Sequence, residues 1–250
     1  MVDGLTFDMR EPGLYRFYRL PCVSEQRVVC SAGVESALSC FGYIWAYGLS
    51  DAGKTADENT RNATKRVLHL GCSDCAFLAA SLFTSIGIQA RVVAAYTFGP
   101  WGGQDDGHTL VELYADDSFG AMTNERWLLY DPSFHRLFML QGKHLSLREV
   151  LENVNHPELM IVPLHGNVSP ALWRCNGYDY GFWIAHRIME EGALLEWYRR
   201  ILNIGLIFKD GWFHYNADNV PESKRELMMK TYKPLHCDEF NRTFYALSRR

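Results

Sequence analysis

The chain has 250 residues, 48% of them apolar, and carries 29 acidic against 25 basic side chains, a formal net charge of −4. This composition, rich in Trp, Tyr and Phe, argues against disorder and can bury a core as one large domain or two small ones. No block of like charge occurs, which argues against nucleic-acid binding. We expect a small-molecule, peptide or glycan-linked substrate instead.

The sequence also argues against export and against a membrane span. The first twenty residues carry acids and a Pro where a secretory signal needs an unbroken apolar run. The long apolar stretch 180–208 is interrupted by charged residues, so we predict a helix that faces a core. Seven cysteines, an odd number, favour reduced thiols in a cytoplasmic protein. The oligomeric state is left open.

The first half of the chain predicts a helix followed by a meander. Residues 14–20 alternate like an edge strand, and 33–49 have the apolar spacing of a helix. A second helix is expected from Cys72 to Ser85, ended by Gly87. Three strands with short turns between them then form an antiparallel meander, at 88–98, 108–115 and 126–134.

The second half is predicted to be mainly helical. Helices are expected at 145–154, 180–208 and 222–232, with one β-like piece at 211–217. The expected fold class is α+β, a helix packed on an antiparallel sheet with added C-terminal helices. We divide the chain into a core, 1–140, and a C-terminal extension, 141–250, packed together as one compact body.

Cys72 and Cys75 stand three positions apart at the start of a predicted helix. A structural zinc site needs four ligands, yet the other five cysteines are scattered and no second C-x-x-C occurs. A redox dithiol would follow the first strand of a βαβ unit, which this pattern does not resemble. Two buried thiols, or one nucleophile with a neighbour, fit the pattern better. We expect no metal and no cofactor.

A cysteine nucleophile needs a base, and the base needs an acceptor on its other nitrogen. His108 opens one predicted strand and Asp131 closes the next. If these strands are neighbours, both side chains lie side by side beneath the helix that carries Cys72. Each residue also has an ordinary structural interpretation, His108 in a turn and Asp131 as the cap of an Asp-Pro turn.

Three segments together resemble the transglutaminase-like superfamily, whose core is similar to that of papain-like thiol enzymes. In that family a Cys opens a helix, an Ala follows four residues later, and Gly-Ile-Pro-Ala-Arg leads into a strand. A Gly-His pair and a Trp shortly before Asp-Pro complete the pattern. The matching positions here are Cys72, Ala76, 87–91, Gly107, His108, Trp127, Asp131 and Pro132.

The resemblance implies a Cys72, His108 and Asp131 triad, with Cys75 as a small core residue. The implied activity cleaves or transfers an acyl group from an amide, peptide or thioester through a Cys thioester. Gln89 replaces the family's Pro, and Thr109 and Leu110 replace a frequent Ala-Trp, so substrate preference does not carry over. The alternative is a transglutaminase-like binding or assembly module whose triad is unused.

Substrate contacts are expected from outside the three matched segments. Tyr96 and Trp101, with the Gly-rich loop 99–107, are candidates to line the cleft, although such a loop is also an ordinary turn. The region after Gly166 is expected to form one cleft wall, chiefly through the aromatic-polar run 208–219, or else to buttress the sheet. Arg91 is expected to pair with a buried carboxylate.

Overall fold

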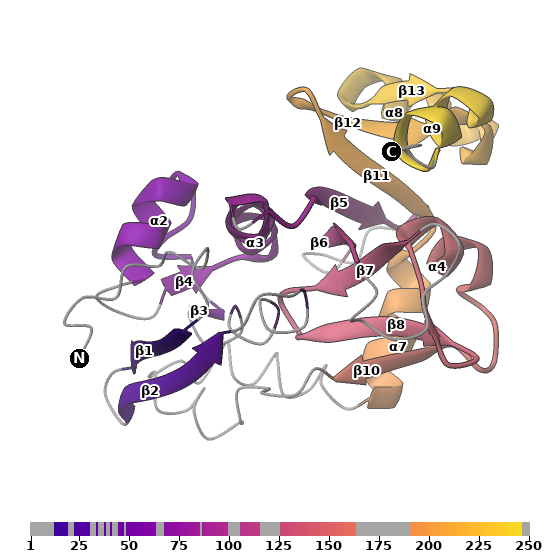
Figure 1. The fold of residues 1–250 in the computed structure, drawn as a ribbon. Helices are drawn as coiled ribbons and strands as arrows, with labels where there is room; N and C mark the ends of the chain where they lie inside the picture. The colour runs from indigo at the N-terminus through magenta and orange to yellow at the C-terminus, as the bar shows by residue number, and fades with distance from the viewer. Residues whose placement is uncertain are drawn as a thin grey trace.

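One large sheet organises the described part of the chain. The computed structural model describes residues 13–19, 23–30, 34, 38, 41, 45–47, 49–63, 68–85, 87–99, 106–115, 126–163 and 191–246. Within them, nine strands form a sheet in the order β10-β8-β7-β6-β5-β11-β12-β13, with β9 paired to β8. Most pairs are antiparallel, and helices cover both faces (Figure 1). The predicted α+β class with an antiparallel sheet is confirmed.

The centre of the sheet is the predicted meander. It consists of β5 (Ala90–Tyr96), β6 (Gly107–Tyr114), β7 (Trp127–Asp131) and β8 (Arg136–Leu140), joined antiparallel in that order. Ala95 pairs with His108, and Val111 pairs with Tyr130. The three strands expected from Val-, Leu- and Tyr-rich runs are confirmed, and β8 is a fourth strand that the prediction missed.

Alternate residues of these strands enter two separate cores. Val92, Val111 and Tyr130 face helix α3 (Cys72–Ser85), whereas Val93, Leu110 and Leu129 face the opposite side. On that opposite side lie α4 (Leu147–Asn153) and α7 (Glu191–Ile201), as Figure 1 shows. The period-2 alternation of the strands therefore decides which helix each side chain meets.

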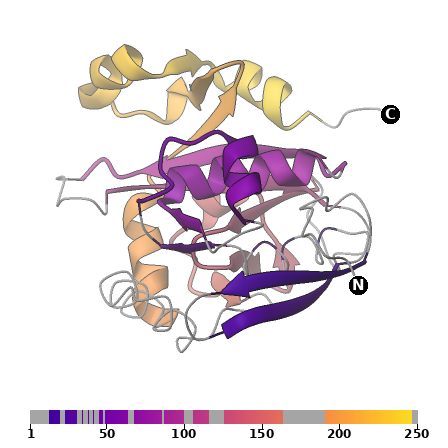
Figure 2. The same cartoon turned by 90° about the vertical axis from the view of Figure 1, so that its left-hand side faces the viewer.

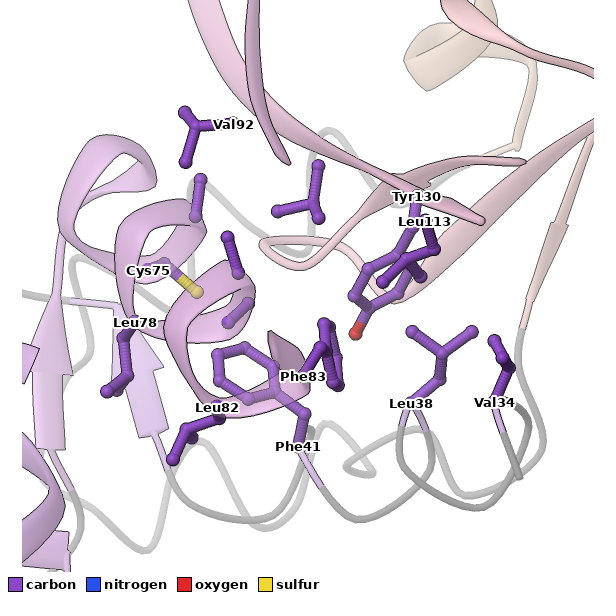
Figure 3. Packing of buried hydrophobic residues seen from close by; sticks show 14 of the residues in the cluster. Val34, Leu38, Phe41, Cys75, Leu78, Leu82, Phe83, Val92, Leu113 and Tyr130 are labelled. Atoms are coloured by element: carbon purple, nitrogen blue, oxygen red, sulfur yellow. The ribbon is translucent and has the colours of Figure 1, made fainter. Parts of the chain in front are cut away.

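Helix α3 has the bounds that the sequence predicts. Gly87, with φ +87°, follows it, and a left-handed glycine is a common helix stop. Cys75 is fully buried in the cluster of Val92, Leu113 and Tyr130 (Figure 3), so its expected place in the core is confirmed. At the end of α3, the ring of Phe83 lies 5.8 Å from that of Phe41.

A buried ion pair ties the sheet to the C-terminal helices. The Arg91 guanidinium donates to the Glu112 carboxylate at 2.6 and 2.8 Å, so the expected carboxylate partner is confirmed. Arg91 also donates to the Phe244 carbonyl at 2.7 Å and stacks 3.8 Å from the Trp127 ring. Glu112 accepts from the backbone N–H of Leu147 at 2.6 Å, which fixes the start of α4.

The C-terminal extension is not an added helical layer. In its described part, β10 (Met160–Pro163), β11 (Ile204–Lys209), β12 (Trp212–Asn216) and β13 (Lys233–Leu235) belong to the same sheet, and β9 (Lys143–His144) pairs with β8. Strand β11 pairs with β5, so the boundary drawn at residue 140 divides one sheet. The helices α8 (Glu222–Thr231) and α9 (Cys237–Phe244) pack beside β13 and β12.

The helix expected at 180–208 is wrong at its C-terminal end. Helix α7 ends at Ile201, and the chain continues as β11 from Ile204. Residues 204–207 are buried on a central strand, where apolar side chains meet a core on both faces. Their unbroken apolar run therefore has neither a helical nor a strand-like period, and the sequence alone could not distinguish the end of the helix from the start of the strand.

Of the N-terminal elements, α2 (Ala56–Ala63) and β4 (Leu68–Leu70) contact α3. Strands β1 (Gly13–Arg19) and β2 (Val23–Cys30) pair antiparallel, and α2 packs next to α3 (Figure 2). The helix expected at 33–49 extends too far, because β3 (Trp45–Tyr47) pairs in parallel with β4. Among the described residues, no helix has both the length and the apolarity to cross a membrane.

Candidate active site

Cys72 is the first residue of α3 and is partly exposed. The His108 side chain and the backbone N–H of Thr109 lie close enough to its sulfur to lower the pKa of the thiol. The N–H of Thr109 has no partner on β7, because the last residue of β6 that pairs with β7 is Val111, two residues away along the strand. Because the β6–β7 pairing stops there, the backbone N–H of Thr109 is left for the Cys72 sulfur.

Thr109 also secures the first turn of α3. Its hydroxyl lies 3.0 Å from the hydroxyl of Ser73, the residue after Cys72. On the other side of the turn, Asp74 accepts from the backbone N–H of Gly53 at 2.9 Å. These two contacts hold the start of the helix against β6 and against the loop before α2, so the position of the Cys72 sulfur is fixed from both sides.

His108 lies near the start of β6 and is 6% exposed. Its Nε2 is 2.8 Å from Oδ2 of Asp131, and because a carboxylate only accepts, Nε2–H is the donor. The hydrogen bond leaves Nδ1 as the ring nitrogen for Cys72. The carboxylate thereby selects the tautomer that points an acceptor at the thiol.

Asp131 ends β7 and is fully buried. Its Oδ1 accepts from the backbone N–H of Ser133 at 2.7 Å and of Phe134 at 3.2 Å. Its Oδ2 accepts from His108 and from the hydroxyl of Tyr198. Oδ1 caps the Asp-Pro turn, and Oδ2 holds the imidazole of His108. Asp131 therefore serves both as the turn cap and as the acceptor for the base, the two roles considered for it from the sequence.

The charges of this row favour a thiolate beside an imidazolium. Burial raises the pKa of Cys72, but the hydrogen bond and charge of His108 and the N–H of Thr109 lower it to about 7. Burial lowers the pKa of His108, whereas the charge and hydrogen bond of Asp131 raise it to about 10. Burial raises the pKa of Asp131, and His108 outweighs it, so that pKa is lowered. Between these values Cys72 and His108 are both charged.

Aromatic rings enclose His108 on the side away from Cys72. Trp197 of α7 lies with its ring centroid 4.9 Å from that of His108, edge to face, and Phe134 lies 5.8 Å away. Trp197 and Phe134 also contact each other at 5.8 Å. A wall of this kind keeps water from the imidazole and strengthens its hydrogen bond to the carboxylate.

Sequence reasoning missed Trp197 and Tyr198 as site residues. It took their segment for a core-facing helix, which holds for Leu194, Tyr198 and Ile201. The expectation that the region after Gly166 forms one wall of the substrate cleft stays a prediction, although Trp197 and Tyr198 of α7 contact His108 and Asp131. The run 208–219, however, forms β11 and the β12 hairpin of the sheet, where Phe208 contacts Phe77 of α3 at 5.0 Å. It is not a loop over Cys72.

The two expected substrate-contacting residues have different outcomes. Trp101 lies outside the described residues. Tyr96 pairs with Gly107 in the sheet, and its ring lies 5.9 Å from the ring of Tyr232. By the alternation of β5 it shares the face of Ala94, whereas His108 shares the face of Ala95. Its contact with a substrate remains a prediction.

A cavity of about 420 Å³ lies elsewhere, between α4, β11 and α9. Leu147, Arg148, Asn203, Cys237 and Tyr245 are among its walls, and none of Cys72, His108 and Asp131 is. This cavity is therefore separate from the candidate active site. In the described part of the chain, no three His, Cys, Asp or Glu side chains gather as ligands of a metal ion would.

Comparison with known proteins identifies a family resemblance. Residues 45–132 match the family model of the transglutaminase-like superfamily, which confirms the resemblance seen in the sequence. The matched segment contains Cys72, His108 and Asp131 and covers less than half of the chain. It ends before α4, α7 and β11, the strand that pairs with β5 on the side away from β6. A comparison with curated proteins found no match.

Proposed function

We propose that this protein is a cysteine-nucleophile enzyme, with a papain-like triad, that cleaves or transfers an acyl group. The observation that carries the proposal is the row of Cys72, His108 and Asp131, in which His108 is hydrogen bonded to Asp131 and lowers the pKa of Cys72. Each side chain has the partner that its role requires, a base for the thiol and an acceptor for the base. The transglutaminase-like match supports the same reaction class.

The reaction starts from the thiolate and the imidazolium. The Cys72 sulfur attacks the acyl carbon, the carbonyl electron pair moves to oxygen, and a tetrahedral intermediate forms. The C–N bond then breaks as the proton on His108 passes to the leaving amine, and a thioester remains. His108, now neutral, takes a proton from water or an acceptor amine as that nucleophile attacks the thioester, which frees the Cys72 thiolate.

The start of α3 favours both anions of this sequence. A helix N-terminus has backbone N–H groups without intrahelical acceptors and a partial positive charge. These groups stabilise the thiolate before the attack. The backbone N–H of Cys72, at the first position of α3, is the donor we assign to the tetrahedral oxyanion.

Amides, peptides and thioesters are the proposed acyl donors, with water or an amine as acceptor. We also propose a cytoplasmic location, where a reduced Cys72 persists. Cys72, Cys75 and Cys237 are free thiols in the described part of the chain, which supports the location. Cell fractionation followed by alkylation of Cys72 before lysis tests it, and a disulfide or an exported protein contradicts it.

Labelling with iodoacetamide separates the enzyme from a transglutaminase-like scaffold. An enzyme with a Cys72 pKa of about 7 is alkylated at Cys72 in mildly acidic buffer, where an ordinary thiol scarcely reacts. A scaffold does not need such a thiol. A screen of acyl donors, each with and without an added amine, then distinguishes hydrolysis from transfer. Slow labelling of Cys72 below pH 7, like that of a free cysteine, contradicts the enzyme.

A further inference from the structure

Tyr198 contacts the row of three side chains from a helix outside the family match. It lies on α7, is fully buried, and donates its hydroxyl to Oδ2 of Asp131. This is the oxygen that accepts the Nε2–H of His108. Oδ1 is occupied by the backbone N–H groups of Ser133 and Phe134. Four donors therefore surround one carboxylate, and Tyr198 is the only side chain besides His108 that these contacts include.

The Tyr198 hydroxyl is held at a fixed position. Its ring lies 4.8 Å from the ring of Phe138 on β8, edge to face. Leu194 and Ile201, one turn before and after Tyr198, are fully buried in the same core. Arg200 of α7 forms an ion pair at 2.6 Å with Asp106, two residues before His108. Helix α7 is thus fastened to the strand that carries the imidazole.

We propose that Tyr198 is a positioning residue that acts through Asp131, both fixing the plane of the carboxylate and sharing the oxygen that holds His108. This inference rests on the proposed function and adds to it the means by which the C-terminal region controls the imidazole. Tyr198 lies after residue 132, where the family match ends, so a residue outside the matched segment helps to orient His108.

Sharing Oδ2 adjusts the acidity of His108. A carboxylate oxygen that accepts from a hydroxyl has less negative charge for a second donor, so the imidazolium is held less tightly. Burial and the charge of Asp131 raise the pKa of Tyr198 well above its usual range, so the hydroxyl stays a donor while the site works. His108 therefore gives its proton to a leaving amine more readily than an Asp131 without Tyr198 would allow.

Other titratable groups on α3, β7 and β8 interact electrostatically with this carboxylate or with Tyr198. Cys72 and Cys75 approach it from α3, Tyr130 precedes it on β7, and Arg136 of β8 acts on Tyr198. The thiol of Cys75 and the hydroxyl of Tyr130 stay neutral, since burial raises both pKa values. Cys72 and Arg136 keep the same surroundings when only the Tyr198 hydroxyl is removed, so a changed pKa of His108 reports that hydroxyl.

The test is the pKa of His108 in Tyr198→Phe, measured by NMR on protein labelled with ¹³C at histidine Cε1. The His108 signal is assigned by its loss in His108→Gln. We expect the pKa of His108 to rise by roughly half a pH unit or more, because a hydrogen bond to a charged group is stronger than a neutral one. We expect kcat on any acyl donor found by the screen to fall while KM stays unchanged. A His108 pKa equal to or below that of the unaltered protein overturns the proposal.

Tyr245→Phe is the matched control. Tyr245 is also buried, and its hydroxyl donates to a buried carboxylate, that of Glu112, at 3.3 Å. Both variants lose one buried tyrosine–carboxylate hydrogen bond, so both lower stability. Only Tyr198→Phe should change the pKa of His108. An equal change in both variants shows a general effect of destabilisation and overturns the specific role of Tyr198.

Incorporation of 3-fluorotyrosine keeps the test available if Tyr198→Phe does not fold. The fluorinated hydroxyl is a stronger donor, so the pKa of His108 should fall, and an unchanged or raised value overturns the proposal. Failure of the proposed function itself has a different signature. In that case iodoacetamide labels Cys72 of the unaltered protein below pH 7 no faster than it labels a free cysteine, and this result does not depend on the effect of Tyr198 on the pKa of His108.

Discussion

His108 reaches Asp131 diagonally across the β6–β7 pair, with Nε2 2.8 Å from Oδ2. The ladder pairs Val111 with Tyr130, so the position opposite Asp131 is Leu110, two residues from His108 on the same face. Diagonal neighbours on one face are within reach of long side chains. A shift of one residue in the register would turn the two side chains to opposite faces. The candidate site therefore depends on the strand register as much as on residue identity.

The rate of alkylation of Cys72 by iodoacetamide should change twice with pH. It should rise through about pH 7, where the lowered pKa of Cys72 makes the thiolate, and change again near pH 10, where the imidazolium of His108 is lost. Activity on an acyl donor should be bell-shaped between the same limits, since it needs both charged forms. Mass spectrometry of the labelled peptide, with Cys72→Ser as control, identifies the site. A single rise near pH 8.5 would show an ordinary thiol.

Substitutions in the row should differ by role. Cys72→Ala and His108→Ala should lower kcat on the order of 10⁶-fold, because the nucleophile and its proton acceptor are lost. Asp131→Asn should lower kcat on the order of 10⁴-fold, because the Asp131 carboxylate orients and stabilises the imidazolium but does not touch the substrate. The double variant of Cys72 and His108 should be no worse than either single one. Turnover by purified Cys72→Ala at the unaltered rate would end the proposal.

Removing Arg91 should destabilise the fold strongly. Arg91→Ala leaves the fully buried carboxylate of Glu112 without its counter-ion, which we expect to lower the free energy of unfolding by about 3–5 kcal/mol. Urea denaturation measures the change. Lys230→Ala is the control, because its pair with Glu226 is largely exposed and should contribute less than about 1 kcal/mol. Equal costs in the two variants would contradict the importance of burial here.

Gly107 provides a test of the packing of Tyr96. A Cβ at Gly107 would lie 2.7 Å from two ring atoms of Tyr96 and 3.2 Å from the carbonyl of Ala95. Gly107→Ala should therefore lower the free energy of unfolding by about 1–3 kcal/mol through overpacking. In the Tyr96→Ala background the same substitution should cost less, and a double-mutant cycle measures the difference. Strictly additive costs would show that the two residues do not contact each other.

The sequence predicts the site well where chemistry and local pattern coincide. A cysteine at a helix start, a Gly-His pair at a strand start and an Asp-Pro at a strand end each have a local signature, and together they predict one row of Cys72, His108 and Asp131. In the structure His108 is 2.8 Å from Asp131 and lowers the pKa of Cys72. The strands are rich in Val, Leu and Tyr and are separated by turn residues, so the bounds of β5 and β6 are predicted to within two residues, while the third predicted strand extends three residues beyond the end of β7. The catalytic role is a separate matter that only kinetics can test.

The contribution of α7 could not be predicted, for a physical reason. A tyrosine on the apolar side of a helix is a core residue by every local criterion, and Tyr198 is indeed buried. Only the tertiary fold shows that its hydroxyl meets the Asp131 carboxylate. Among the strands after residue 141, β12 agrees with the β-like piece expected at 211–217. Strand β11 was missed for a related reason, since it is buried on both faces and has no alternation to reveal it.

The pairing of β11 with β5 also affects how the protein folds during its synthesis. Ile204 lies opposite Tyr96, so the centre of the sheet stays unfinished while the ribosome synthesises everything between them. Contacts between positions so distant in sequence form late and slowly. Helix α7 stands directly before β11, so Tyr198 meets Asp131 at about the same late step. A growing chain would therefore carry the Cys72 thiol long before Tyr198 completes the hydrogen bonds of the Asp131 carboxylate.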